Sequence, residues 1–394
     1  MRASTIPADR YEQRLEHARE ALRDRGGAAL LIGVGADLRW LTGYAALPLE
    51  RLTMLVVPAE GETTLIVPRL ERAAAGHAPT VSAGLIPVRT WEETDDPFLL
   101  AAELARGLGN GGSSSGGSSP EGRPFLVSDR LWASFLLRLQ EALPGAAFGV
   151  ASTVLRELRM VKDAEEVGLL RQAAHAADRV VAAVARGSLV GRTEADVARE
   201  VRTRLVEEGH DEAAFWIVAS GSNSASPHHD PGERRIQAGQ PIVLDIGGTI
   251  QGYGSDITRT VWGTGADGAE APGDEYRRLY AVLQEAQAEA TRAVRPEASC
   301  ESIDRVARDS ITAAGFGPNF IHRTGHGIGL EGHEDPYLVA GNGELLREGH
   351  AFSVEPGIYL DGRYGARIED IVVCGRDGPD VLNEAPRDLL VVAG

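Results

Sequence analysis

The second half of the chain places carboxylates inside apolar, β-branched runs, and this pattern constrains the fold more than any other. Asp245 lies within PIVLDIGGTI, and Asp256, eleven residues later, directly precedes the run ITRTV. The glycine-rich stretch between them predicts a return that pairs the two strands and sets the carboxylates side by side. Because a buried carboxylate is costly without a cation or hydrogen bonds, the pair indicates a cation site. Either aspartate alone is compatible with a turn or capping role.

Two further carboxylates follow the same pattern near the C-terminus. Glu355 lies in AFSVEPGIYL (351–360) and Glu369 in ARIEDIVVC (366–374), and both runs predict strands. Four carboxylates on strands and a histidine suit Mn²⁺ or Co²⁺, with Zn²⁺ and Fe²⁺ as alternatives. Two such ions about 3.5–4 Å apart can share a bridging carboxylate and a hydroxide, so the pattern is compatible with a two-metal centre.

Three histidines surround a glycine-rich turn in HRTGHGIGLEGHEDP (322–336). They are His322, His326 and His333, and the glycines between them allow the backbone to approach a site closely. One histidine alone would usually be a core or surface group, but three in this setting predict a metal or catalytic cluster. The GxGxG string within the segment lacks the Rossmann spacing, so a nucleotide site is not expected.

The length of 394 residues suits two domains. A helix over 9–25, a strand over 28–33 and a hairpin over 53–68 predict an α/β domain, to which we assign residues 1–158. The Gly/Ser-rich segment 109–122 interrupts this domain. Because residues 125–143 resume a strand-then-helix pattern that needs a partner sheet, we interpret the segment as a surface loop within the domain. An interdomain tether is the alternative.

The second domain, residues 159–394, combines long helices with β-strands. Asp163 with Glu166 forms a capping-box spacing at the start of the first helix, and Thr193 precedes the second. We expect paired helices against a mostly antiparallel, curved sheet, an α+β arrangement. The predicted helices span 162–186, 193–208, 273–294 and 299–315, and the predicted strands span 215–221, 241–250, 258–263, 351–360 and 366–374.

These motifs resemble those of the pita-bread metallopeptidases, which include methionine aminopeptidase, aminopeptidase P and prolidase. The resemblance rests on VLDIG, GSDITRT, TGHGIGL, VEPG and RIED in the family's order, and extends over about residues 162–390, more weakly over the N-terminal half. It implies a pita-bread catalytic domain with a smaller N-terminal α/β, creatinase-like domain. It also implies two divalent metal ions, with Mn²⁺ favoured, held by Asp245, Asp256, His326, Glu355 and Glu369.

The long segment ahead of these motifs favours aminopeptidase P or prolidase over methionine aminopeptidase, and creatinase lacks the ligand set. The resemblance implies catalytic roles for His228 in VASGSNSASPHHD, for His333 and for Glu355. His229 is the alternative to His228. Substrate-binding candidates are Phe215 and Tyr253 for a proline ring, and Arg367 for orienting a ligand or binding a substrate carboxylate. Core positions and a plain salt bridge are the respective alternatives.

The implied reaction is hydrolysis of the bond before proline in di- or oligopeptides, by an Xaa-Pro dipeptidase or an Xaa-Pro aminopeptidase. A metal-bridging hydroxide would attack the carbonyl, and Glu355 would be both ligand and proton shuttle. His228 and His333 would donate hydrogen bonds to the oxyanion and the substrate backbone. Two alternatives stay open: hydrolysis of another C–N bond on the same scaffold, and a non-catalytic pita-bread protein that binds a partner.

Composition narrows the class of partner. Lys and Arg number 40 against 57 Asp and Glu, and the net charge of −17 argues against nucleic acid or an anionic membrane surface as partner. The polar N-terminus lacks the apolar stretch of a signal peptide, and no run is long enough to span a bilayer. With Cys300 and Cys374 as the only cysteines, no disulfide framework is expected, which fits a soluble, cytoplasmic protein. A homodimer is implied by the resemblance alone.

Overall fold

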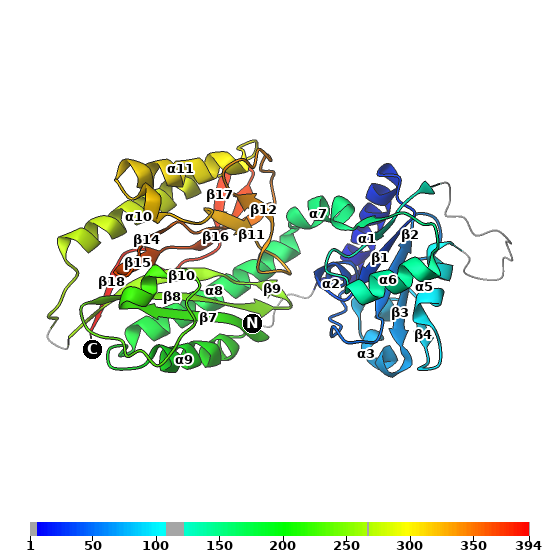
Figure 1. Cartoon of the computed structure of the whole chain (residues 1–394), viewed down its shortest axis with the longest axis horizontal. Coiled ribbons are helices and arrows are strands. Elements are labelled where there is room, and N and C mark those ends of the chain that lie inside the picture. The colour runs from blue at the N-terminus through cyan, green and yellow to red at the C-terminus, as the bar shows by residue number, and fades with distance from the viewer. Residues whose placement is uncertain (1–5, 108–121, 266–267, 394) are drawn as a thin grey trace. The chain divides into compact units, whose positions relative to one another are not determined.

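The computed structural model describes residues 6–107, 122–265 and 268–393. Two compact units divide the chain, one over Ile6–Arg159 and the larger one from Met160 onward. Figure 1 shows the helices and strands of each unit. Among the described helices, none is both long and apolar enough to cross a lipid bilayer.

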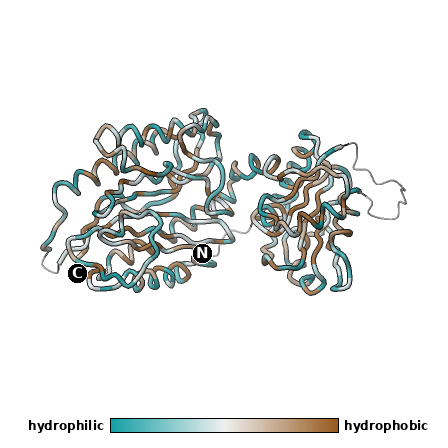
Figure 2. Tube along the Cα trace, in the orientation of Figure 1, coloured by the Kyte–Doolittle hydropathy of each residue, from teal (hydrophilic) through white to brown (hydrophobic). Residues whose placement is uncertain are grey.

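The N-terminal unit is built on a mixed six-stranded sheet with the order β4-β3-β2-β1-β5-β6. Its strands β1, β2 and β3 are buried at every residue, which requires cover on both faces of the sheet, and Figure 2 shows them as an apolar band. The predicted hairpin is confirmed, because β2 and β3 pair antiparallel. The strands are β1 Ala29–Gly33, β2 Met54–Pro58, β3 Thr64–Pro68, β4 Val88–Trp91, β5 Phe125–Val127 and β6 Phe148–Val150.

The first helix of this unit is amphipathic. Helix α1 buries Tyr11, Leu15, Ala18 and Leu22, the residues whose helical spacing predicted it. The α-helices are α1 Ala8–Asp24, α2 Ala36–Thr42, α3 Arg72–Ala75, α4 Pro79–Ser82, α5 Pro97–Ala105, α6 Ala133–Ala142 and α7 Ser152–Met160, and a 3-10 helix covers Arg69–Glu71.

Most of the Gly/Ser-rich segment 109–122 lies outside the described residues. Strand β4 before it and strand β5 after it belong to the same sheet, and β5 pairs with β1 in parallel. The segment therefore connects parts of one domain, and the tether interpretation is wrong.

The second unit contains two five-stranded sheets and a two-stranded one. The first has the order β18-β10-β8-β7, with β9 beside β8, and the second has the order β12-β11-β13-β16-β17; β14 pairs with β15. The pairs within these sheets are antiparallel except β10 with β18, as the prediction of a mostly antiparallel arrangement required. The strands are β7 Glu212–Ser220, β8 Gln240–Ile250, β9 Tyr253–Gly254, β10 Ile257–Thr264, β11 Gly325–Gly327, β12 Glu334–Leu338, β13 Ala351–Val354, β14 Gly357–Leu360, β15 Tyr364–Arg367, β16 Asp370–Gly375, β17 Gly378–Val381 and β18 Leu390–Ala393.

Each five-stranded sheet is packed against its own pair of helices (Figure 1). Helices α8 (Ala164–Arg186) and α9 (Glu194–Glu207) share one apolar core with β7, β8 and β10. Helices α10 (Asp274–Ala293) and α11 (Cys300–Ala313) share another with β13 and β16. The remaining short elements are the 3-10 helices η3 Gly221–Ala225 and η4 Gly317–Asn319.

The predicted helix starts are confirmed in detail. The Asp163 side chain accepts a hydrogen bond from the backbone N–H of Glu166, and the Glu166 carboxylate accepts one from the backbone N–H of Asp163. Thr193 caps α9 through the N–H of Asp196. Local sequence therefore determines where these two helices begin.

The prediction that 351–360 and 366–374 are continuous strands is wrong. The first run is divided into β13 and β14, which belong to different sheets, and the second into β15 and β16. Pro356 offers no N–H to a strand ladder, so the first run cannot continue its pairing there. Glu355 and Glu369 lie at these two breaks rather than within strands.

Candidate metal centre and active site

Strand register brings the first two carboxylates to one region. Strand β8 carries Asp245 and pairs antiparallel with β10, with Asp245 opposite Thr258. Asp256 immediately precedes β10, and both aspartates are buried. The predicted pairing of the two strands is confirmed.

The strand breaks bring the two glutamates to the same region. The backbone N–H of Glu355 donates to the carbonyl of Thr324 at 2.7 Å, and that of Glu369 donates to the carbonyl of Thr258 at 3.1 Å. Thr324 lies two residues before His326, and Thr258 lies two residues after Asp256. At each strand break, the backbone of the glutamate is therefore hydrogen-bonded to a segment that carries another candidate ligand.

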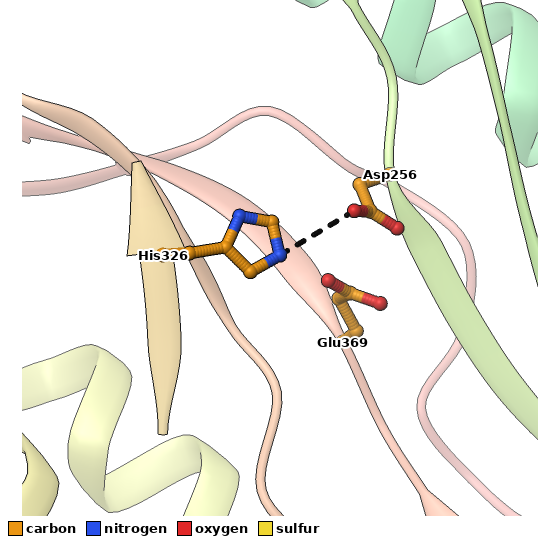
Figure 3. A group of neighbouring side chains, drawn as sticks. All are labelled: Asp256, His326 and Glu369. Carbon is orange, nitrogen blue, oxygen red and sulfur yellow. Dashed lines mark ion pairs between the residues drawn. The ribbon is translucent and has the colours of Figure 1, made fainter. Parts of the chain in front are cut away.

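Three of these side chains form a compact group that offers ligands to a metal ion. The ligand atoms of Asp256, His326 and Glu369 all lie within 4.8 Å of one another (Figure 3). His326 Nε2 lies 3.6 Å from Asp256 Oδ2 and 3.3 Å from an oxygen of Glu355. The three residues come from β11 and from the segments just before β10 and β16.

A cavity of about 760 Å³ opens at this group. All five side chains that the sequence nominated as metal ligands line it, as do four other nominated residues: Phe215, His228, His333 and Arg367. A concave site with convergent polar groups is the usual form of a small-molecule site.

Two carboxylates show directly that the site fits a cation. Asp245 uses one oxygen to accept from Arg367, and Glu369 uses one to accept from the Thr258 hydroxyl at 2.7 Å. The other oxygen of each, Asp245 Oδ1 and Glu369 Oε1, is buried and has no hydrogen-bond partner among the described residues. A buried oxygen without a donor is costly, and a divalent cation supplies the missing partner.

His326 presents the appropriate nitrogen to such an ion. Its Nδ1 lies 3.1 Å from the carbonyl oxygen of Gly327, which can only accept, so Nδ1 carries the proton. Burial, and then the neighbouring His333, lowers the pKa of His326 to about 3, so the ring is neutral near pH 7. The lone pair of Nε2 therefore faces carboxylate oxygens, an arrangement that a shared cation stabilises.

The pKa shifts of the acidic side chains show that these carboxylates repel one another. Burial first, and neighbouring carboxylates second, hold the pKa of Asp256 and of Glu369 well above the ordinary value. Burial also raises the pKa of Glu355 to about 7, with Arg367 opposing the rise and Asp245 adding to it. The buried carboxylates repel one another because Arg367 alone does not neutralise them, and a divalent ion would reduce this repulsion.

Arg367 serves a candidate ligand directly. Its guanidinium is buried, pairs with Asp245, and also donates to the Tyr359 hydroxyl at 2.7 Å and the Thr258 hydroxyl at 3.1 Å. Orienting a ligand and the alternative, a plain salt bridge, both match this geometry. Binding a substrate carboxylate does not, because Asp245 already takes that place.

The two neighbouring histidines after Pro227 have different surroundings. His228 lines the cavity, whereas His229 is turned to the buried Glu194, with its Nε2 2.8 Å from the carboxylate. His333 also lines the cavity, and its ring centroid lies 3.8 Å from that of His326. Of the two histidines, His228 is thus the one that faces the cavity.

The two aromatic candidates for a proline pocket separate in the same way. Phe215, on β7, lines the cavity. Tyr253 does not; it is buried, and its hydroxyl donates to Glu166 at 2.8 Å. The structure thus gives Tyr253 the surroundings of the alternative, a core position next to Glu166 of the α8 capping box.

Sequence reasoning missed several residues of the cavity. His322 stood in the predicted histidine cluster without a role; its Nε2 accepts from the Tyr359 hydroxyl at 2.9 Å, and burial, then Arg367, lowers its pKa to about 4. Arg323, beside it, contacts His333 at 3.2 Å. Ile217 and Ile321 add apolar surface to the wall. The density of histidines signalled His322, but no local pattern signalled the others.

Comparison with known proteins agrees with this architecture. Residues 168–376 match the model of metallopeptidase family M24, and residues 14–161 match the creatinase/prolidase N-terminal domain. A protein named probable dipeptidase PepE, from Mycobacterium tuberculosis, is 44% identical over 100% of this chain and 99% of its own length. An Xaa-Pro dipeptidase from Lactobacillus helveticus is 32% identical over 96% of this chain and 98% of its own length.

A solved structure gives the same result. The crystal structure of a prolidase from Thermococcus sibiricus has a TM-score of 0.87 and 32% identity, and covers 99% of this chain and 100% of its own. The family matches span both units, and the fold combines a pita-bread catalytic domain with a creatinase-like N-terminal domain. The chain belongs to metallopeptidase family M24 and is a metallopeptidase.

Proposed function

We propose that the chain hydrolyses the peptide bond before proline, with Xaa-Pro dipeptides as its substrates. The observation that carries this proposal is the cavity itself, in which the five nominated ligands meet three further histidines and an apolar wall. The relatives named Xaa-Pro dipeptidase and prolidase support the same substrate class. Their similarity extends over almost the whole chain.

Two divalent ions, Mn²⁺ by preference, would be held by Asp245, Asp256, His326, Glu355 and Glu369. When bound, such ions lower the pKa of water toward neutrality and polarise the scissile carbonyl. The unpartnered oxygens of Asp245 and Glu369 support this assignment. Arg367 holds Asp245 in place from the opposite side.

The chain's own groups then handle the proton and the developing charge. Glu355, which lines the cavity beside His326, would take a proton from water and return it to the leaving nitrogen. His228 and His333 line the cavity and donate hydrogen bonds to the substrate backbone and to the oxyanion as it develops.

Substrate selection would come from the walls of the cavity. A proline imide has no N–H to recognise, so the ring must be bound by shape against Phe215, Ile217 and Ile321. Arg323 also lines the cavity. Among the described residues its side chain forms no ion pair with a candidate metal ligand, and it suits the free carboxylate of a dipeptide.

A substrate panel tests the proposal. Xaa-Pro, Xaa-Pro-Yaa and Xaa-Ala peptides are assayed with Mn²⁺ added, and we expect Xaa-Pro to give the highest kcat/KM. Preference for Xaa-Pro-Yaa would indicate an aminopeptidase. Equal cleavage of Xaa-Ala, or no cleavage of any peptide, would contradict proline specificity and leave another C–N bond as the target.

We also propose a cytoplasmic homodimer. Cys300 and Cys374 are the two cysteines of the chain and both are buried, and so few thiols fit a reducing compartment. The family resemblance supports the dimer, and sedimentation velocity at micromolar concentration would test it; a species of 41.9 kDa alone would contradict it.

A further inference from the structure

Glu194, whose side chain is buried, and His229, which is partly exposed, form a hydrogen-bonded pair next to a segment that lines the cavity. Glu194, the first residue of α9, has a fully buried side chain, and its carboxylate accepts a hydrogen bond from His229 Nε2 at 2.8 Å. His229 follows His228, which lines the cavity together with Ser226 and Pro227. The pair is therefore one residue away from a group that faces substrate.

The Glu194 carboxylate also holds the chain that leads to this segment. Its Oε1 accepts from the backbone N–H and the hydroxyl of Ser220, both at 2.7 Å, and the amide nitrogen of Asn223 lies 3.0 and 3.1 Å from its two oxygens. Ser220 ends β7 and Asn223 lies in η3. One carboxylate thus fixes three points of the stretch 220–229.

These hydrogen-bond donors stabilise the buried carboxylate of Glu194, which has few other favourable interactions. Within the described ranges, no arginine or lysine side chain forms an ion pair with the Glu194 carboxylate, although the start of a helix favours a negative charge there. Removing a donor from a buried carboxylate is costly, so its set of partners defines one conformation of the surrounding chain. The stretch is held from the cavity side as well, by Arg367 on the carbonyl of Pro227 at 3.4 Å.

We propose that Glu194 and His229 are positioning residues for the reaction: they hold the segment 226–229 so that His228 is presented to the substrate. This inference rests on the proposed function, in which His228 contacts substrate. In the part of the chain that the structure describes, neither side chain hydrogen-bonds to a candidate metal ligand, so they would act on the rate through His228 and not through the metals.

A comparison of kcat in two backgrounds tests the proposal. The variants are His229→Leu, which removes the donor, and His229→Gln, which places an amide N–H near the position of Nε2. Each is made in the wild type and in His228→Ala, with Mn²⁺ content and the midpoint of thermal unfolding measured throughout. We expect His229→Leu to lower kcat on an Xaa-Pro dipeptide about 10- to 100-fold, with little change in KM or metal content, since small misplacements of a catalytic group have effects of this size. His229→Gln restores most of the rate.

The decisive result is the loss of that effect when His228 is absent. In the His228→Ala background, His229→Leu should change kcat less than about twofold, because residues that act as a unit are not additive. The same loss in both backgrounds, an unchanged kcat in the wild type, or loss of metal would overturn the proposal. If His229→Leu does not fold, His229→Gln and Glu194→Gln replace it in the test. A wild-type kcat in His229→Gln with a reduced kcat in Glu194→Gln supports the proposal. Equal losses of kcat in the two variants contradict the proposal. An inactive wild type would instead refute the proposed substrate.

Discussion

The second unit contains buried carboxylates in two different settings: Glu194 next to His229, and the candidate metal ligands at the cavity. Glu194 is surrounded by protein donors on both oxygens, whereas Asp245 and Glu369 each keep one oxygen without any described donor. Both arrangements are out of water, where an unsatisfied charge is costly. The difference indicates different partners. Protein donors satisfy the carboxylate of Glu194, whereas the unpaired oxygens of Asp245 and Glu369 call for a cation.

The largest effect we expect comes from removing a ligand of the cation group. Asp256→Ala and His326→Ala should each lower kcat by more than about 10³-fold, because the ions supply several kcal/mol of charge stabilisation. Circular dichroism and thermal unfolding should still show a cooperative fold. Asp309→Ala, at an exposed position on α11, is the matched control and should keep wild-type activity. Normal turnover by either ligand variant in metal-controlled buffer would break the assignment.

The effect of Mn²⁺ on the free energy of unfolding should distinguish Glu194 from the candidate metal ligands. Adding Mn²⁺ at about 100 times its Kd to the metal-free protein should add roughly 2.7 kcal/mol to the free energy of unfolding, since only the folded state holds the ion. Glu194→Gln should show the same gain as the wild type, whereas Glu369→Gln should lose most of it. Differential scanning calorimetry measures all three, and an equal gain in Glu369→Gln would contradict its role as a ligand.

Stability against pH should reveal the repulsion among the acids in the metal-free protein. With its pKa raised to about 7, folded Glu355 binds a proton that the unfolded chain releases near its ordinary pKa of 4.5. The free energy of unfolding therefore falls as pH rises between these values. Glu355→Gln removes this loss, so its stability relative to wild type should rise by roughly 1–3 kcal/mol over that range. His326, with its pKa lowered to about 3, changes stability in the opposite sense but does so in both proteins. A flat difference in chelator-treated samples would show that Glu355 is not held protonated.

The smallest effect distinguishes core from cavity. Tyr253→Phe should cost about 1 kcal/mol of stability through the lost hydrogen bond to Glu166, with kcat/KM unchanged. Phe215→Leu should do the reverse: it should raise KM for an Xaa-Pro dipeptide a few-fold with little effect on unfolding. Parallel kinetics and thermal unfolding of both variants measure this, and a rise in KM for Tyr253→Phe would restore it as a pocket residue.

Much of this molecule follows from local sequence. Asp163 with Glu166 and Thr193 marked two helix starts correctly, because capping depends on residues three apart. The run around Asp245 predicted its strand for a similarly local reason. What could not be predicted depends on distant partners: whether Tyr253 reaches Glu166 or the cavity, and which of His228 and His229 turns toward Glu194.

The breaks at Glu355 and Glu369 show the same limit. Apolar residues continue through both positions, so the pattern predicted single strands. The backbone of each glutamate instead bonds to a segment far away in sequence, Thr324 or Thr258. No local propensity contains that information, although Pro356 marked one of the breaks.

Anomalous diffraction from crystals of the Mn²⁺-loaded protein tests the central claim most directly. The account predicts two manganese peaks within bonding distance of Asp245, Asp256, His326, Glu355 and Glu369, with Glu194 remaining bonded to His229. A single peak elsewhere, or none between these five side chains, would contradict it.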